Sequence, residues 1–323
     1  MDNLTHSLTG LFLSRAGCNR ITPLATPLLI IASNLPDVDI LAALGGSITY
    51  LHWHRHLTHS LLAAPVLALA LAAIFRLFRP QVALFPAAGL ALVGILSHLL
   101  LDLTNTYGVR ILLPFGETWY HWDLTPIIDF WIWAALFLAV AGPFLARLVG
   151  SEIGERRKIG TGQGFAVAAL LFVISYNGGR ALLHNRVLGA LNSRNYEGSA
   201  PIRVAAFPFP INPLRWHAVA ETESAYRLFD FQLPLGFDPS VAETVQKIAT
   251  SPALEAASRT EPFRVMADFA QYPVYRVTPR AQPDGGFQIE LSDLRFNFSS
   301  TALINSRNQV EKSTFSFDGG PPR

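Results

Sequence analysis

Four long apolar stretches are the feature that most constrains what this chain can fold into. They cover residues 60–79, 82–101, 126–147 and 164–185. Each approaches the roughly 20 residues that an α-helix needs to cross the hydrocarbon core of a bilayer. The chain is 50% hydrophobic and 15% charged, whereas charged residues make up about one quarter of a soluble globular protein. We therefore expect four membrane-spanning helices in an all-α polytopic bundle.

Two shorter helices are expected before these spans, at about 4–15 and 22–35. The second contains Pro27 and ends at Pro36. Both are shorter than the roughly 20 residues of a full crossing. They could form a tight in-and-out pair, or re-entrant elements packed against the bundle.

A change in composition near residue 190 predicts two domains, a membrane-embedded helical domain over 1–190 and an extramembrane domain over 191–323. Alternating runs at 287–291 and 294–298 are typical of strands, so the second domain is expected to be β-rich or α+β. The segment 207–219, FPFPINPLRWHAV, is interpreted as an ordered loop on the bundle or membrane surface. The final residues, DGGPPR, are expected to be disordered.

Lys and Arg residues predict the orientation, because short basic loops stay in the cytoplasm. Arg55 and Arg110 fall instead among the His- and Asp-rich loops, opposite the other basic residues of this region. An Arg beside a metal site could bind an anionic group. The chain is therefore expected in the inner (cytoplasmic) membrane, with its His- and Asp-rich loops and its C-terminal domain on the non-cytoplasmic side. Eight basic residues share the opposite, cytoplasmic side: Arg15, Arg20, Arg76, Arg79, Arg147, Arg156, Arg157 and Lys158.

Charge and cysteine content exclude several classes of function. The net charge is +2, and no basic stripe interleaved with aromatic residues is present, so nucleic acid is not an expected partner. The single cysteine, Cys18, excludes an internal disulfide and a thiolate metal cluster. The first ten residues, MDNLTHSLTG, lack the basic leader of a secretory signal, so the first apolar stretch is expected to be retained.

Two pairs of ionisable residues close apolar helices. His98 and Asp102 are spaced i, i+4, which places both on one helix face. They could bind one ion or form a hydrogen-bonded pair without metal. Asp37 and Asp39 follow Pro36, which ends the helix before them. Carboxylates spaced i, i+2 could serve one ion or bridge two, although an exposed turn is the simpler interpretation of this pair alone.

The segment 52–60, HWHRHLTHS, holds four histidines directly before an apolar stretch. Helical spacing favours His56 together with His59, and His54 could reach the same ion as His59 only if it precedes the helix. Spacing leaves this choice open. Histidines placed with Trp53 at the headgroup level of the membrane are the alternative without metal.

Three further residues complete the candidate set. His6 begins an apolar helix on the same expected face. Asp123 is expected near the surface, and Asp129 is expected to act behind the ligands or as a charge at a helix N-terminus. Imidazole and carboxylate ligands without thiolate suit Zn²⁺ or Mn²⁺ better than Ca²⁺.

The blocks NLTHSLTG, NLPDVD, HRHLTHS, SHLLLDLTNTYGVRILLPF and WDLTPIID resemble the signature of YdjM-type membrane-bound metal-dependent hydrolases. The resemblance covers about residues 1–135 in order, and it implies a distant relation to the zinc-dependent phospholipase C and P1 nuclease superfamily, whose helical fold holds up to three zinc ions. The segment Phe207–Trp216 resembles a block of the longer members. The resemblance prefers His54 over His56, with Arg55 and Thr58 as accompanying polar residues. The implied ligands are His6, Asp37, Asp39, His54, His59, His98 and Asp102.

These features together predict a membrane-bound hydrolase of phosphoester bonds with two or three metal ions, most readily Zn²⁺, with Mn²⁺ as the second choice. Asp39 is the expected carboxylate that orients the attacking water, and Arg55 is the expected partner of an anionic group. A site at the outer, non-cytoplasmic membrane surface favours a lipid, a lipid-linked phosphate or another small phosphate ester as substrate. The alternatives are a metal or proton transporter and a membrane scaffold with a structural metal.

Overall fold

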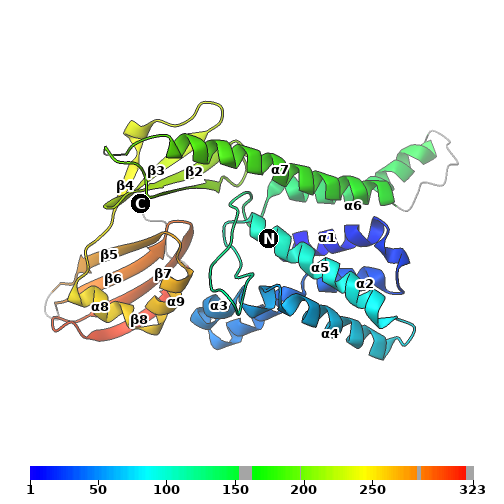
Figure 1. Cartoon of the computed structure of the whole chain (residues 1–323), viewed down its shortest axis with the longest axis horizontal. Helices are drawn as coiled ribbons and strands as arrows, with labels where there is room; N and C mark the ends of the chain where they lie inside the picture. The colour runs from blue at the N-terminus through cyan, green and yellow to red at the C-terminus, as the bar shows by residue number, and fades with distance from the viewer. Residues whose placement is uncertain (153–161, 197, 282–284, 318–323) are drawn as a thin grey trace.

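The computed structural model describes residues 1–152, 162–196, 198–281 and 285–317, with a helical N-terminal part and a β-sheet C-terminal part (Figure 1). The N-terminal part begins at α1 (Asn3–Arg15), where the Asp2 carboxylate accepts hydrogen bonds from the first backbone N–H groups of the helix. Such a cap satisfies donors that have no partner inside the helix. The other long helices of this part are α2 (Ala25–Ala32), α4 (Ala63–Phe78), α5 (Leu84–Thr104), α6 (Phe130–Glu152) and α7 (Gln163–Asn192).

Short helical segments connect these helices on the side of the β-sheets. They are the 3₁₀ segments η2 (Leu35–Gly45) and η3 (Leu57–His59), with α3 (Ser47–Trp53) between them; a further 3₁₀ turn, η1 (Cys18–Arg20), joins α1 to α2. Pro36 stands at the beginning of η2, where a missing backbone N–H costs nothing.

Three of the described helices are long and apolar enough to cross a membrane, namely α5, α6 and α7. The prediction of four single-helix spans is therefore not confirmed. The stretch 60–79 forms only the 16-residue α4. Pro65 lies in the first turn of this helix, and its ring would clash with the backbone of a helix that began much earlier. Two bent pairs reach the length of a span when each pair is taken as one, α2 with η2 at 46° and Ser47–His59 with α4 at 81°.

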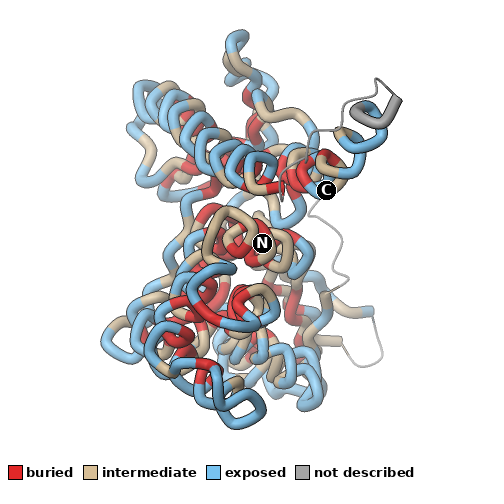
Figure 2. The backbone as a smooth tube through the Cα atoms, turned by 90° about the vertical axis from the view of Figure 1, so that its right-hand side faces the viewer, coloured by how far each residue is buried: buried red, intermediate tan, exposed pale blue. Residues whose placement is uncertain are grey.

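The helices pack through small residues. A Cβ added at Gly94 of α5 would lie 2.8 Å from the Ala32 Cβ of α2, and one added at Gly10 of α1 would lie 2.7 Å from the Leu29 carbonyl oxygen. These glycines allow α2 to approach both of its neighbours closely. In Figure 2 the buried parts of the helical tube lie where helices face one another, and the buried residues include Leu28 and Ile95 at 0% exposure.

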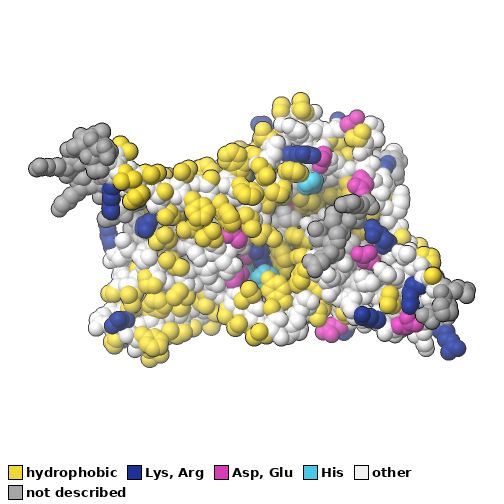
Figure 3. Space-filling view, turned by 180° about the vertical axis from the view of Figure 1, so that it is seen from behind, with side chains coloured by type: hydrophobic (Ala, Val, Ile, Leu, Met, Phe, Trp, Pro, Cys, Tyr) yellow, Lys and Arg dark blue, Asp and Glu magenta, His cyan; other side chains and the backbone are white. Residues whose placement is uncertain are grey.

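The surface of the helical part differs in composition from that of the β-sheet part. Seen from behind, the helical half is largely hydrophobic, with Lys and Arg at the end furthest from the sheets (Figure 3). Arg15, Arg20, Arg76, Arg79 and Arg147 belong to the set of basic residues predicted on one side of the spans, whereas Arg156, Arg157 and Lys158 lie outside the described residues.

Two four-stranded antiparallel sheets form the described C-terminal part, in agreement with the expected β-rich or α+β domain. The first has the order β1 (Arg203–Pro208), β2 (Arg215–Glu221), β3 (Ala225–Gln232) and β4 (Glu243–Gln246). The second has the order β5 (Pro273–Pro279), β6 (Phe287–Asp293), β7 (Phe296–Ile304) and β8 (Val310–Ser316), with α8 (Pro252–Ser258) and α9 (Glu261–Phe269) against it. The strands expected at 287–291 and 294–298 correspond to β6 and β7.

Helix α7 connects the bundle to the first sheet. Its last turns place Val187 and Leu191 against the buried Trp216 of β2. The segment 207–219 was predicted as a loop, and most of it is instead the β1–β2 hairpin, because Phe207 and Pro208 pair with His217 and Trp216. The residues DGGPPR, predicted to be disordered, lie outside the described part of the chain.

The tip of this hairpin does lie on the helical bundle. Trp131 Nε1 of α6 donates to the Ile211 carbonyl oxygen at 3.0 Å, and Arg180 of α7 donates to the Pro213 carbonyl oxygen.

At the other end of β2, Glu221 forms ion pairs with Arg203 and Lys247, each at 2.8 Å.

Candidate metal centre

Three elements bring histidines and aspartates together between the bundle and the sheets. Asp37 and Asp39 come from η2, His59 from η3, and His98 and Asp102 from the last turns of α5. Figure 3 shows acidic, basic and histidine side chains gathering in this middle region. Within the described residues, two groups could hold a metal ion: Asp37, His59, His98 and Asp102, and Asp37, Asp39 and His54.

Five of the six distances between the ligand atoms of the first group are close to those of a tetrahedral zinc site. His59 Nε2 lies 3.1 Å from His98 Nε2, 3.4 Å from Asp37 Oδ1 and 3.5 Å from Asp102 Oδ2. His98 Nε2 lies 3.4 Å from Asp102 Oδ2 and 3.7 Å from Asp37 Oδ1. A tetrahedron with metal–ligand bonds of about 2.0–2.1 Å has edges of about 3.3–3.4 Å. These four ligand atoms therefore surround a space that fits such an ion.

The partners of the outer nitrogens of the two imidazoles leave the inner nitrogens available to a cation. His98 Nδ1 lies 2.8 Å from the Ser33 carbonyl oxygen, which can only accept, so the proton of the neutral ring is on Nδ1. His59 Nδ1 lies 3.2 Å from an Asp39 carboxylate oxygen and is fixed in the same way. In neutral rings both Nε2 lone pairs then face each other at 3.1 Å. A carboxylate or carbonyl behind a metal-binding histidine is the usual arrangement.

An unpaired carboxylate oxygen supports the same interpretation. Asp102 is fully buried at 0% exposure, and its Oδ2 has no hydrogen-bond partner among the described residues. A buried acceptor without a donor costs about 1–3 kcal/mol. A cation placed between the four ligand atoms would remove this cost.

The second group shares Asp37 with the first. His54 Nδ1 lies 2.9 Å from Asp39 Oδ1, and these two side chains are partly accessible, at 12% and 6% exposure. His59, His98 and Asp102 have side chains at 0%. Asp37, at 11%, stands between the closed group and the more open one. This is the position of a carboxylate that could bridge two ions.

Arg55 and His6 lie behind Asp102. Arg55 Nη2 is 3.1 Å from Asp102 Oδ1, and Nη1 donates to Asn105 Oδ1 at 3.1 Å. His6 Nε2 is 3.3 Å from the same Asp102 oxygen, and the His6 ring stacks on His98 with centroids 3.8 Å apart. The Met1 amino nitrogen also contacts Asp102 Oδ1. These contacts favour a role for Arg55 and His6 in holding Asp102.

The backbone at Arg55 decides which histidines face the cluster. Its φ is +57°, a left-handed conformation that is uncommon for a residue other than glycine. Its backbone N–H donates to Asp39 at 2.7 Å, and Thr58 Oγ1 donates to the same carboxylate oxygen at 3.1 Å. The reversal turns His54 toward Asp39. His56 instead stacks near His52, with ring centroids 6.0 Å apart, and belongs to neither metal-binding group.

The other sequence candidates lie elsewhere. Asp123 is 3.0 Å from His121 Nδ1. Asp129 accepts from the backbone N–H groups of Trp131 and Ile132 and so caps α6, one of the two roles considered for it. Arg110 forms an ion pair with Asp268 of α9 and belongs to neither metal-binding group.

Three residues around the cluster were not singled out in the sequence. Ser33 contributes only its backbone carbonyl oxygen, so its residue type could not indicate this role. Asn105 and Tyr107 lie in the block SHLLLDLTNTYG, close after Asp102, and that position was the available signal. Asn105 Oδ1 accepts from the Tyr107 backbone N–H at 2.8 Å, and the Arg55 guanidinium lies over the Tyr107 ring, 4.8 Å from its centroid.

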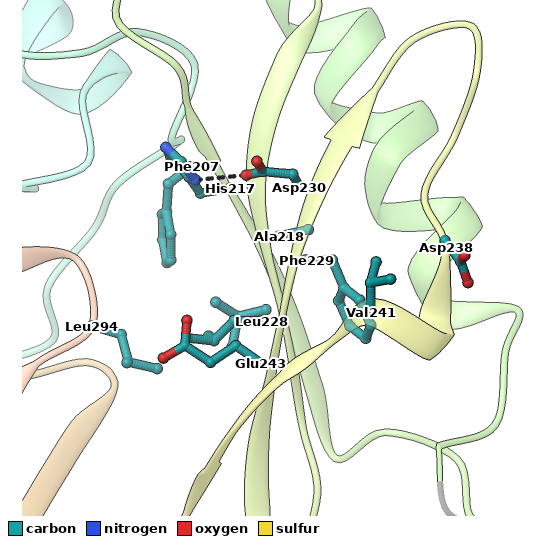
Figure 4. Close-up of a pocket in the computed structure, with 11 residues that line it drawn as sticks. Phe207, His217, Ala218, Leu228, Phe229, Asp230, Asp238, Val241, Glu243 and Leu294 are labelled. Carbon is teal, nitrogen blue, oxygen red and sulfur yellow. Dashed lines mark ion pairs between the residues drawn. The ribbon is translucent and has the colours of Figure 1, made fainter. Parts of the chain in front are cut away.

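The cavity drawn in Figure 4 lies apart from the cluster, on the C-terminal domain. It measures about 590 Å³ and is lined by residues that include Phe207, Leu228 and Glu243. His217 and Asp230 form the ion pair drawn there, at 3.1 Å, and both side chains are more than half exposed. This cavity has no buried metal-binding group and does not compete with the His–Asp cluster as a candidate centre.

Apolar helices able to cross a membrane, with a buried His–Asp cluster at their ends, define a helical membrane protein with a candidate metal centre. Residues 1–187, more than half of the chain, match the model of the YdjM inner membrane protein family, and the chain belongs to this family. It is 29% identical over 109 residues to the uncharacterized protein YfhP of Bacillus subtilis (strain 168), which covers 34% of this chain and 33% of YfhP. The chain thus matches about a third of the length of this curated relative. No solved structure matches the chain.

Proposed function

We propose that this protein is a membrane-bound metal-dependent hydrolase of phosphoester bonds, with two zinc ions, or three, in the His–Asp cluster and Mn²⁺ as the alternative metal. The single observation that carries the proposal is the shared position of Asp37 between a closed four-ligand group and a more accessible three-ligand group. Adjacent ions that share a carboxylate are typical of enzymes that cleave phosphate esters. The resemblance to YdjM-type hydrolases implies a distant relation to zinc-dependent phospholipase C and P1 nuclease, and this relation supports the same class of reaction.

Each residue of the cluster has a proposed role. Bound metal would supply a Lewis acid that lowers the pKa of a coordinated water and stabilises charge on the attacked phosphoryl group. His59, His98 and Asp102 would hold the inner ion, His54 with Asp39 would hold the outer one, and Asp37 would be shared between the two. Asp39 belongs to the partly accessible group, and we assign it the role of orienting the attacking water. The role of Arg55 as a partner of an anionic substrate stays a prediction.

The surroundings of the cluster favour a lipid or lipid-linked phosphate over a soluble one. The residues between and after the two aspartates of η2 are apolar and exposed: Val38 is 43% exposed, Ile40 58% and Leu41 61%. Exposed apolar side chains beside a polar site are typical of a surface that contacts lipid. We place this surface, the cluster and the C-terminal domain on the non-cytoplasmic side of the inner membrane, by the distribution of Lys and Arg.

A second candidate function is the transport of a metal ion or proton. It is favoured by the two bent helix pairs, because the breaks at 46° and 81° fall next to Asp37 and His59. Broken helices often carry the ion-binding groups of transporters. A structural metal in a scaffold is less favoured, because a structural site is expected to be closed, whereas His54 and Asp39 are partly accessible.

The test uses the full chain purified in detergent and loaded with zinc. We expect turnover of a phosphodiester or phospholipid substrate, its loss on chelation, and its loss in His98→Ala. His56→Ala is the matched control, because His56 belongs to neither metal-binding group. Zinc bound stoichiometrically without turnover across phosphomonoesters, phosphodiesters and phospholipids would refute the hydrolase. Zinc or proton flux in proteoliposomes would then favour the transporter.

A further inference from the structure

A turn at residues 105–108 connects the candidate metal centre to the C-terminal domain. Asn105 Oδ1 accepts hydrogen bonds from the backbone N–H of Tyr107 at 2.8 Å and from Arg55 Nη1 at 3.1 Å. The Gly108 carbonyl oxygen accepts a further bond from Arg55 at 3.3 Å. Arg55 in turn lies 3.1 Å from Asp102 Oδ1. This turn therefore holds the Arg55 guanidinium, which is one of the groups that contact Asp102 Oδ1.

Arg295, between β6 and β7, holds the same turn from the other side. Its side chain is 0% exposed, and its Nη1 donates to the Thr106 carbonyl oxygen at 2.9 Å. Its Nη2 donates to the Phe269 carbonyl oxygen at 3.1 Å. Asp293, also at 0% exposure, orients the guanidinium through bonds of 2.9 and 3.1 Å. The guanidinium is planar and rigid, so two bonds to one carboxylate fix where the others point.

The Tyr107 side chain gives the turn a second attachment to the C-terminal domain. Its ring packs against Phe269 and Phe296, with centroids 4.9 and 5.6 Å away. The opposite partner is the Arg55 guanidinium, 4.8 Å from the ring centroid. The ring also meets His54 at 5.4 Å. Tyr107 is 5% exposed, so displacement of the C-terminal sheet would move a group that contacts both Arg55 and a candidate ligand.

We infer that Arg295 is a positioning residue for the metal centre, acting through the 105–108 turn on Arg55 and Asp102, and that the C-terminal domain is in this way part of the site. This inference rests on the proposed function, because it requires metal in the cluster. It extends that proposal to residues beyond the family match, which ends at residue 187. Partners behind the ligands commonly change metal affinity by about 10- to 100-fold.

The experiment compares the full chain with Arg295→Lys and Arg295→Gln, each loaded with Co²⁺ in place of zinc. Lysine keeps the charge, but it cannot donate to Thr106, Phe269 and Asp293 in the same fixed geometry. We expect metal affinity to fall by about 10- to 100-fold and the visible absorption of bound Co²⁺ to change in shape. Arg276→Gln is the matched control, because Arg276 lies on β5 of the same sheet and is 53% exposed. It should alter neither reading.

A purely structural role of Arg295 would lower thermal stability but leave the affinity and the absorption spectrum as they are in the wild type, and this result would overturn the inference. If Arg295→Gln does not fold, Tyr107→Leu tests the same connection through the ring under Arg55, and an unchanged spectrum again overturns it. A wild-type chain that binds no metal would refute the proposed function, and this inference with it. A wild type that binds metal with variants indistinguishable from it refutes this inference alone.

Discussion

Asp39→Asn tests two roles of Asp39, as a ligand of the outer ion and as the hydrogen-bond partner behind His59. Its carboxylate lies 2.9 Å from His54 Nδ1 and 3.2 Å from His59 Nδ1, and it accepts the Arg55 backbone N–H at 2.7 Å. Asparagine has almost the same shape, but it has one acceptor oxygen and no charge. The variant therefore cannot serve both imidazoles while also accepting from the backbone and from Thr58.

The expected magnitude differs for the two ions. The inner ion keeps all four ligand atoms and loses only the partner behind His59, so its affinity should fall by about 10- to 100-fold, or about 1.4–2.7 kcal/mol. The outer ion loses one of its three ligands. That ligand, Asp39, is the carboxylate that it does not share with the inner ion. We expect it to be lost at micromolar metal, so that the stoichiometry falls by one ion per chain.

The assay is competition with a chromophoric chelator, using metal-depleted full chain in detergent. Asp129→Asn is the control, because Asp129 is a buried carboxylate, 2% exposed, that caps α6 apart from the cluster. It should lose some stability and keep its metal. If Asp39→Asn bound the same number of ions with the same affinity as the wild type, Asp39 would have neither role.

Three further predictions concern packing, pH and topology. Gly94→Ala should lower stability by about 1–3 kcal/mol and weaken zinc binding, because the added methyl meets α2, whereas Gly89→Ala on the same helix meets nothing within 4 Å; equal unfolding temperatures for the two would contradict this. Burial alone would raise the pKa of Glu221, but its bonds to Lys247 and Arg203 hold the pKa below its ordinary value of 4.5. The stability of the C-terminal domain that depends on this group should be complete above pH 4.5 and fall as the pH drops below it; Glu221→Gln should flatten that part of the unfolding profile, and a profile with the wild-type slope would disprove the assignment. A reporter enzyme that folds only outside the cytoplasm should be active when fused to the C-terminus, and activity of a cytoplasmic reporter instead would reverse the proposed orientation.

The sequence predicted much of the cluster because its residues are placed by regular structure. His98 and Asp102 share a helix face at i, i+4 in any α-helix, and the structure brings both to the same space. Pro36 predicted a helix end before the two aspartates, although α2 already ends at Ala32 and Pro36 lies at the start of η2. The role of these residues as metal ligands stays a prediction.

The choice between His54 and His56 could not follow from spacing. Spacing arguments assume continuous helix, whereas the backbone reverses at Arg55 with φ of +57°. A left-handed residue other than glycine is held by its surroundings, here by the bond from its N–H to Asp39. Only the resemblance to family members preferred His54, which shares a candidate group with Asp37 and Asp39, whereas His56 belongs to neither group. Which of the two histidines binds metal stays a prediction.

The four predicted single-helix spans are not confirmed, because three of the described helices pass as spans and two bent pairs could add to them. Hydropathy sums the apolar residues of 60–79 without regard to where a helix can begin. Pro65 confines the helix to Ala63–Phe78, and the residues before it form η3 with His59. The link from Arg295 to the 105–108 turn could not be predicted either, because it joins residues 189 positions apart through a backbone carbonyl.

The most direct test of the account is the metal content of the full chain, measured by plasma mass spectrometry after purification in detergent. We predict about two zinc ions per chain, loss of both in Asp37→Ala because that carboxylate is shared, and an unchanged content in His56→Ala. A wild-type chain without stoichiometric metal, or an Asp37→Ala variant that retains all of it, would contradict the metal centre.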